Sequence, residues 1–173
     1  LDEIMHALYF AYYPLVIGGI VIAWTGGRRR GPTPAPGFHT AFTGMMLGFF
    51  LAYVWYPFLP ARGPWENADL VAGLRPFAEG PFTHVIGLII SAAAVSGGCF
   101  PSAHVSGAWA VTYGLSMMRA KATPVFLMAA MGLSIACIYT RYHHGVDVIA
   151  GFVVGIAGGR LGAVLAPGKR ASH

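Results

Sequence analysis

Two short stretches of the sequence carry side chains that could transfer a phosphoryl group between oxygen atoms. The stretch Phe-Pro-Ser-Ala-His ends at His104, and the stretch Arg-Tyr-His-His-Gly-Val-Asp covers residues 141–147. Each stretch stands at the start of an apolar segment that we predict to be helical. Because Asp147 follows His143 by four residues, their side chains share one face of a helix. Two histidines, a carboxylate and an arginine therefore form a candidate phosphoryl-transfer site.

Each of these groups has a separate chemical role. Asp147 can accept a proton from one ring nitrogen of His143, which orients the ring and leaves the other nitrogen free to attack phosphorus. His104, when protonated, can supply the leaving alkoxide with a proton, a step that contributes roughly 10²–10⁴ in rate. The expected intermediate is a phosphohistidine on His143.

Four further residues are candidates for binding phosphate. Ser102 is a typical helix cap, so the helix that starts at Ala103 offers free N–H groups and a positive dipole end to an anion. Arg141 can pair with two phosphate oxygens through its planar guanidinium group. Arg62 lies on a turn that three prolines define, on the side of the membrane where we place both histidines.

The composition is that of a membrane protein. Of the 173 residues, 56% are hydrophobic and only 10% are charged, whereas soluble domains carry about 25% charged residues. The apolar residues form five runs, each near the length that crosses a bilayer. We therefore predict one all-α domain over residues 1–173, a polytopic transmembrane bundle of five spans with a sixth span upstream. The predicted spans are 4–24, 39–59, 103–118, 123–140 and 146–166.

Two connecting segments interrupt this pattern. The Gly and Pro residues of segment 25–38 predict a linker without regular structure. Residues 60–101 form a long outer loop, and the apolar stretch 83–99 within it is short and rich in Ser, Ala and Gly. Counting this stretch as a span would invert the last three helices and place their basic ends outside. We therefore predict an interfacial or re-entrant helix there.

The charged residues fall into two groups along this topology. The net charge is +5, and alternating spans place eight basic residues on one side of the membrane. All six acidic residues lie on the other side, together with Arg62, Arg75 and Arg141. Basic loops stay cytoplasmic, so the acidic side, which bears both histidines, is extracytoplasmic. The basic residues act as topology signals, and we expect no nucleic-acid partner. The eight are Arg28, Arg29, Arg30, Arg119, Lys121, Arg160, Lys169 and Arg170.

Metal and disulfide chemistry are alternatives at these positions. The sequence has no CxxC or HExxH pattern, and an arginine beside the histidines would repel a cation, so we expect no metal and no cofactor. Cys99 and Cys137 are expected to be buried thiols rather than a disulfide. Tyr9, Tyr12 and Tyr13 are expected in an interfacial aromatic belt, with a place in a headgroup pocket as the alternative.

These motifs resemble those of the PAP2 (type 2 phosphatidic acid phosphatase) superfamily of membrane lipid phosphatases and phosphotransferases. Residues 101–104 are similar to its PSGH motif, with Ala103 in place of glycine, and His143 with Asp147 is similar to its second motif. The resemblance covers residues 1–162. It implies a polytopic helical bundle and a reaction that needs no metal.

Two departures from the superfamily pattern indicate one of its branches. The phosphatase branch has an arginine six residues before the second histidine, where this chain has Cys137, and an upstream lysine motif that this chain lacks. Arg141 and the stretches 9–13 and 60–64 instead resemble the inositolphosphotransferase branch, which includes inositol phosphorylceramide synthases. That resemblance implies transfer of a phospho-headgroup from a membrane lipid to a lipid alcohol acceptor.

We therefore expect an integral membrane lipid phosphotransferase. Hydrolysis of a lipid phosphate or diphosphate is the alternative, because both reactions pass through the phosphohistidine and differ only in the second attacking group. A non-catalytic lipid-binding subunit is the alternative of another class. The intact set of His104, His143 and Asp147 argues against it, since ionisable groups at membrane depth usually mark a functional site.

Overall fold

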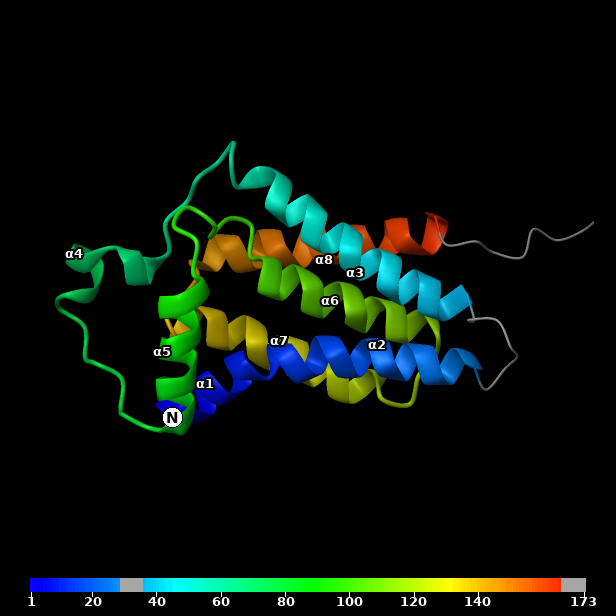
Figure 1. The fold of residues 1–173 in the computed structure, drawn as a ribbon, viewed down its shortest axis with the longest axis horizontal. Helices are drawn as coiled ribbons and strands as arrows, with labels where there is room; N and C mark the ends of the chain where they lie inside the picture. The colour runs from blue at the N-terminus through cyan, green and yellow to red at the C-terminus, as the bar shows by residue number, and fades with distance from the viewer. Residues whose placement is uncertain (29–35, 166–173) are drawn as a thin grey trace, which may run out of the picture.

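The computed structural model describes residues 1–28 and 36–165, and these residues form helices and loops with no β-strand (Figure 1). This confirms the predicted all-α class. Helix extends into both ends of segment 25–38, so the predicted linker is too long, and its residues 29–35 lie outside the described part. The elements are α1 (Asp2–Phe10), α2 (Tyr12–Arg28), α3 (Pro36–Trp55), η1 (Pro64–Glu66), α4 (Ala68–Val71), α5 (Pro81–Ala93), α6 (Ala103–Met117), α7 (Thr123–Tyr139) and α8 (Gly145–Leu165).

The long helices form a bundle with α6 at its centre. Helices α2, α3, α6, α7 and α8 run along the long axis in Figure 1, and α6 contacts each of the other four. Most residues of α6 are buried, because other helices surround it. Many of the buried residues are small, which lets the neighbouring helices approach closely. The helices α4 and α5 gather with the starts of α1, α6 and α8 at one end of the bundle (Figure 1). We call this the loop end, because the connection 56–102 covers it.

Three helical segments are long and apolar enough to cross a membrane: Asp2–Gly26, Gly37–Trp55 and Gly145–Leu165. The first of these joins α1 and α2, which are interrupted only at Ala11. Helices α5 and α7 are apolar but shorter. Many large apolar side chains are exposed on the outside of the bundle, as expected for contact with lipid. The count of five spans stays a prediction.

Gly151, Gly155 and Gly159 recur every four residues along α8, and small residues at this spacing let the helix pack closely against α6. A Cβ atom at Gly151 would lie 2.6 Å from the carbonyl oxygen of Ser102, and one at Gly155 would lie 2.5 Å from that of Ser106. Both distances are far below a normal carbon–oxygen contact. The backbone at the start of α8 therefore lies directly against the start of α6, which sets the distance between the residues that these two starts carry.

Two acidic residues of α1 hold the outer loop. Buried Asp2 forms an ion pair with Arg75 (2.9 Å), and its carboxylate raises the pKa of that guanidinium group. Glu3 accepts hydrogen bonds from the amides of Phe82 (2.9 Å) and Thr83 (2.8 Å) at the start of α5. A carboxylate at this helix end is favoured by the helix dipole. These contacts fix α5 across the loop end of the bundle (Figure 1).

Helix α5 differs from the sequence prediction in its bounds. It covers Pro81–Ala93, so the predicted helical stretch 83–99 is helical only in its first part. Proline at the first helical position explains the earlier start. The backbone turns extended at Ala94, and residues 94–99 form a loop that leads to the first motif.

Replacing Gly151 with alanine is expected to destabilise the bundle by about 1–3 kcal/mol, because the added Cβ overlaps the Ser102 carbonyl and forces α8 away from α6. Gly87→Ala in α5 is the matched control, since a Cβ there meets nothing within 4 Å. It is expected to be neutral or slightly stabilising. Thermal unfolding of the two purified variants in detergent measures the difference, and equal melting temperatures would contradict the close packing of α6 and α8.

Candidate active site

The first motif histidine stands in the first turn of α6. Ser102 caps this helix, as its residue type predicted, because its Oγ accepts a hydrogen bond from the Val105 amide (3.4 Å). The Ser102 amide donates to the carbonyl oxygen of Asp147 (3.0 Å), which joins the start of α6 to the start of α8. His104 is thereby held beside the residues that precede α8.

The second motif histidine lies in the short connection between α7 and α8. The His143 amide donates to the carbonyl oxygen of Cys137 (3.0 Å) and so ends α7. Within this turn Arg141 has a φ of 64°, in the left-handed region. Asp147 Oδ2 accepts a hydrogen bond from the His144 amide (2.7 Å), so the carboxylate closes the first turn of α8 and lies beside the His143 ring.

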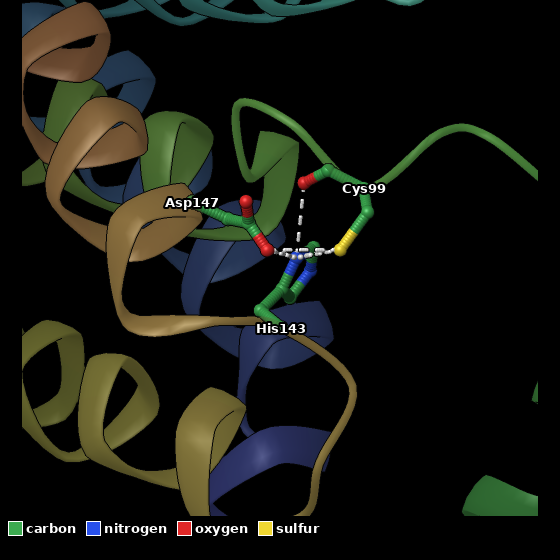
Figure 2. A group of neighbouring side chains, drawn as sticks. All are labelled: Cys99, His143 and Asp147. Atoms are coloured by element: carbon green, nitrogen blue, oxygen red, sulfur yellow. Dashed lines mark hydrogen bonds and ion pairs between the residues drawn. The ribbon is translucent and has the colours of Figure 1, made fainter. Parts of the chain in front are cut away.

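The ring of His143 is held through its Nδ1 atom. Figure 2 shows the Cys99 carbonyl oxygen, the Cys99 thiol and the Asp147 carboxylate around this nitrogen, at 3.1, 3.3 and 3.8 Å respectively. A carbonyl oxygen only accepts hydrogen bonds, so Nδ1 carries the ring proton in this arrangement. The lone pair is then on Nε2. The protein therefore holds His143 through Nδ1 and leaves Nε2 as the ring nitrogen with the lone pair.

Cys99 is a site residue that the sequence did not indicate. Its carbonyl oxygen, rather than Asp147, makes the shortest contact with His143 Nδ1, while its Sγ donates to Asp147 Oδ2 (3.0 Å). Burial and the neighbouring Asp147 carboxylate raise the pKa of the Cys99 thiol, which keeps it protonated as a donor. Both Cys99 and Cys137 are free and buried, which agrees with the expectation of two thiols. No pattern in the sequence connects this loop cysteine to a histidine 44 residues later.

A Cys–His–Asp relay does not fit this geometry. In such a relay the nucleophile and the acid contact opposite nitrogens of the imidazole. Here Cys99 and Asp147 approach the same nitrogen of His143. The thiol is therefore part of the support for His143 and is poorly placed to be activated by it.

The ring of His104 faces that of His143 and is surrounded by tyrosines. The two imidazole centroids are 5.9 Å apart. The hydroxyl of Tyr9 lies 3.4 Å from His104 Nε2, and the Tyr12 ring meets His104 edge to face at 4.6 Å. Tyr9 is buried, so it is a site residue rather than part of an interfacial belt. This is the pocket alternative that the sequence left open for the tyrosine group.

Both histidines line one cavity of about 320 Å³ at the loop end. Ala103 also lines it, whereas Ser102 is fully buried beneath the helix start and does not. The side chains around the cavity are mostly aromatic or small and apolar, with one carboxylate and, among the described residues, neither arginine nor lysine. The lining residues are Tyr9, Tyr53, Tyr56, Trp65, Glu66, Ile90, Ala93, Ala94, Val95, Gly98, Cys99, Ala103, His104, Tyr142 and His143.

The two arginines predicted to bind phosphate lie away from this cavity. The Arg141 guanidinium stacks over the Phe77 ring at 4.4 Å and donates to the Arg75 carbonyl oxygen (2.8 Å). Arg62 is exposed and lines a second hollow of about 250 Å³ together with His144. The structure therefore brings together His104, His143, Asp147 and Ala103 but not the two arginines, whose contact with phosphate stays a prediction.

These features are those of a helical membrane protein with a pair of histidines in a cavity at one end of its bundle. A family model described as the PAP2 superfamily matches residues 1–161, so the chain belongs to this superfamily. Comparisons with curated proteins and with solved structures gave no match. Membership indicates lipid phosphatase or phosphotransferase chemistry, and together with the apolar helices it indicates an integral membrane protein.

Replacing Tyr9 with phenylalanine is expected to slow turnover of a lipid substrate about two- to tenfold, because the ring packing on His104 remains while one hydrogen bond to it is lost. Tyr13→Phe is the matched control, since the ring of Tyr13 contacts Phe10 and Tyr12 rather than either histidine. Initial rates at saturating substrate measure the effect. Equal rates for the two variants would show that the Tyr9 hydroxyl does not contribute to turnover.

Proposed function

We propose that the protein transfers a phospho-headgroup from a phosphodiester membrane lipid to a lipid alcohol, without a metal ion, through a phosphohistidine on His143. The observation that carries this proposal is the arrangement of the two imidazoles across one cavity. His143 is held by Nδ1, so its Nε2 is available for attack. His104 stands opposite at a centroid distance of 5.9 Å, close enough to exchange a proton with a group bound between the rings.

The proposed reaction has two balanced half-reactions. In the first, Nε2 of His143 forms a bond to phosphorus, the bond to the lipid oxygen breaks, and protonated His104 gives its proton to that oxygen. In the second, His104 takes the proton from the acceptor hydroxyl, whose oxygen forms a new bond to phosphorus as the bond to His143 breaks. The Asp147 carboxylate stabilises the positive charge that develops on the His143 ring.

The charge of the cavity favours a phosphodiester donor. A phosphomonoester carries about −1.5 to −2 charge at neutral pH, whereas a phosphodiester carries a single charge. No arginine or lysine among the described residues lines the cavity, and Glu66 in its wall adds negative charge. Tyrosine hydroxyls and the amides at the start of α6 are the available donors to phosphate oxygens. This set suits one negative charge better than two, and it supports headgroup transfer over hydrolysis of a lipid phosphate.

The cover of the cavity favours an alcohol as the second attacking group. The end of α5 and the loop after it place Ile90, Ala93, Ala94 and Val95 in the cavity wall. Apolar side chains there limit the access of water and accommodate lipid chains. An acceptor held in place beside the phosphohistidine then competes with water despite the high concentration of water.

We further propose that the loop end faces the extracytoplasmic side and that α5 lies at the membrane interface. The five long helices α2, α3, α6, α7 and α8 are then the spans. The distribution of charge supports this orientation. All six acidic residues lie at the loop end, whereas Arg119 and Lys121 lie at the other end, in the turn between α6 and α7 (Figure 1). Basic segments remain on the cytoplasmic side of membranes.

A cysteine introduced at Asp69 should react with a membrane-impermeant maleimide in intact cells, and one at Lys121 should react only after permeabilisation. Both positions are exposed. The experiment uses a chain in which Cys99 and Cys137 are replaced by alanine, so that only the introduced thiol reports. Labelling of position 121 from outside would reverse the orientation.

Purified protein supplied with a phosphodiester phospholipid is expected to form a new lipid faster when diacylglycerol or ceramide is added than it releases headgroup into water. His143→Ala should abolish both reactions, and His84→Ala, an exposed histidine at the start of α5, is the matched control. Thin-layer chromatography of radiolabelled donor follows both products. Rapid release of phosphate from phosphomonoesters, unaffected by every acceptor, would instead assign a lipid phosphatase, and no turnover of any lipid would favour a binding subunit.

A further inference from the structure

The support around His143 contains three groups that commonly bind metal ions. Cys99 Sγ, His143 Nδ1 and Asp147 Oδ2 lie within 4.8 Å of one another, and all three residues are buried (Figure 2). Their separations are 3.0 Å between sulfur and carboxylate, 3.3 Å between sulfur and nitrogen, and 3.8 Å between nitrogen and carboxylate. The proposed reaction uses the imidazole and the carboxylate, and it gives the thiol no chemical role.

These separations are close to those of a tetrahedral zinc site. Bonds of about 2.3 Å to sulfur and about 2.0–2.2 Å to nitrogen and oxygen place the ligand atoms roughly 3.4–3.6 Å apart. Shifts of a few tenths of an ångström would bring the three atoms to this geometry. We propose that Cys99, His143 and Asp147 bind a zinc ion, and that the bound ion switches the active site off.

The ligand set selects a soft cation over the common hard ones. A thiolate and an imidazole favour zinc, whereas magnesium and calcium require oxygen ligands. The thiolate and the carboxylate together balance the two positive charges of the ion. The arginine expected to repel a cation from this place does not do so, because the Arg141 guanidinium lies over Phe77.

An ion can reach this site from the cavity. Cys99 and His143 both line the cavity, so the three ligand atoms lie at the edge of the space in which the substrate is proposed to bind. The amide of His144 donates to Asp147 Oδ2 (2.7 Å) and would hold the carboxylate in place around the ion.

Inactivation follows from the protons of the His143 ring, and this consequence rests on the proposed function. When zinc binds, the thiol of Cys99 releases its proton to solvent, and a zinc–sulfur bond forms. The Nδ1 proton of His143 moves to Nε2 as a zinc–nitrogen bond forms. Nε2 then has no lone pair with which to attack phosphorus. The ion also occupies the carboxylate of Asp147 that would stabilise the charged ring.

Cobalt(II) is the probe that tests the site without lipid turnover, because a cobalt–thiolate bond gives a charge-transfer absorption band. Full-length protein in detergent is titrated with cobalt(II) and then with zinc(II). The expected result is one cobalt ion per chain, a thiolate band, and loss of the band when zinc is added. Cys99→Ser should abolish the band, and Cys137→Ser, the other buried free cysteine, should retain it. Asp147→Asn should weaken cobalt binding at least about tenfold.

Thermal unfolding shows whether each variant is folded. Absence of the band in folded protein, or its persistence in Cys99→Ser with loss in Cys137→Ser, would overturn the proposed site. Zinc inhibition of lipid turnover, reversed by EDTA and at least about tenfold weaker in Cys99→Ser, is expected if both proposals hold. A thiolate band in a protein that turns over no lipid would leave the metal site in place and contradict only the proposed function.

Discussion

The contact between the starts of α6 and α8 is the constraint on which the rest of the site depends. The Ser102 amide donates to the Asp147 carbonyl oxygen (3.0 Å), and the backbone of Gly151 lies against the Ser102 carbonyl. One helix start carries His104, and the residues just before the other carry His143. Their rings are thus brought within 5.9 Å although 39 residues separate them in sequence. A side chain at Gly151 would overlap Ser102 and Val105, the residues on either side of the Ala103–His104 pair.

The surroundings of His143 also define which nitrogen of its ring donates a hydrogen bond to the protein. The carboxylate of Asp147 is used twice, by the His144 amide and by the Cys99 thiol, which leaves it at 3.8 Å from the imidazole. The Cys99 carbonyl oxygen instead accepts the hydrogen bond from Nδ1–H of the ring. A buried, well-satisfied network of this kind favours one ring orientation, because each alternative leaves a polar group without a partner. Asp147 then acts on the His143 ring mainly through its negative charge, and Cys99 acts on the ring mainly through its backbone carbonyl oxygen.

Local sequence signals were sufficient for the elements that carry the histidines. Ser102 as a cap and the four-residue step from His143 to Asp147 predicted two helix starts, and the alternation of the spans predicted that both histidines lie at the same end of the bundle. The four-residue spacing of Gly151, Gly155 and Gly159 is also typical of a helix that packs closely against its neighbours. These inferences depend on residues that are near one another in the chain, where residue type and periodicity determine the structure.

The remaining site residues depend on long-range contacts that no local pattern contains. Cys99 reaches His143 only because residues 94–99 leave α5 as a loop, and Tyr9 reaches His104 only because α1 packs beside α7 and α5. The direction of the Arg141 side chain could not be predicted from a local pattern either. Its left-handed backbone turns the guanidinium towards Phe77, whereas the sequence alone suggested a phosphate contact. Sequence could place this arginine near the motif but could not give the direction of its side chain.

We propose that His143 attacks phosphorus through Nε2 because its Nδ1 is held by the protein. The most direct test is to trap the covalent intermediate with a labelled phosphodiester lipid and locate the adduct. Peptide mass spectrometry identifies the modified residue, and phosphorus NMR against histidine standards substituted on either nitrogen identifies the atom. We expect an adduct on Nε2 of His143. An adduct on Nδ1 of His143, on His104 or on Cys99 would contradict it.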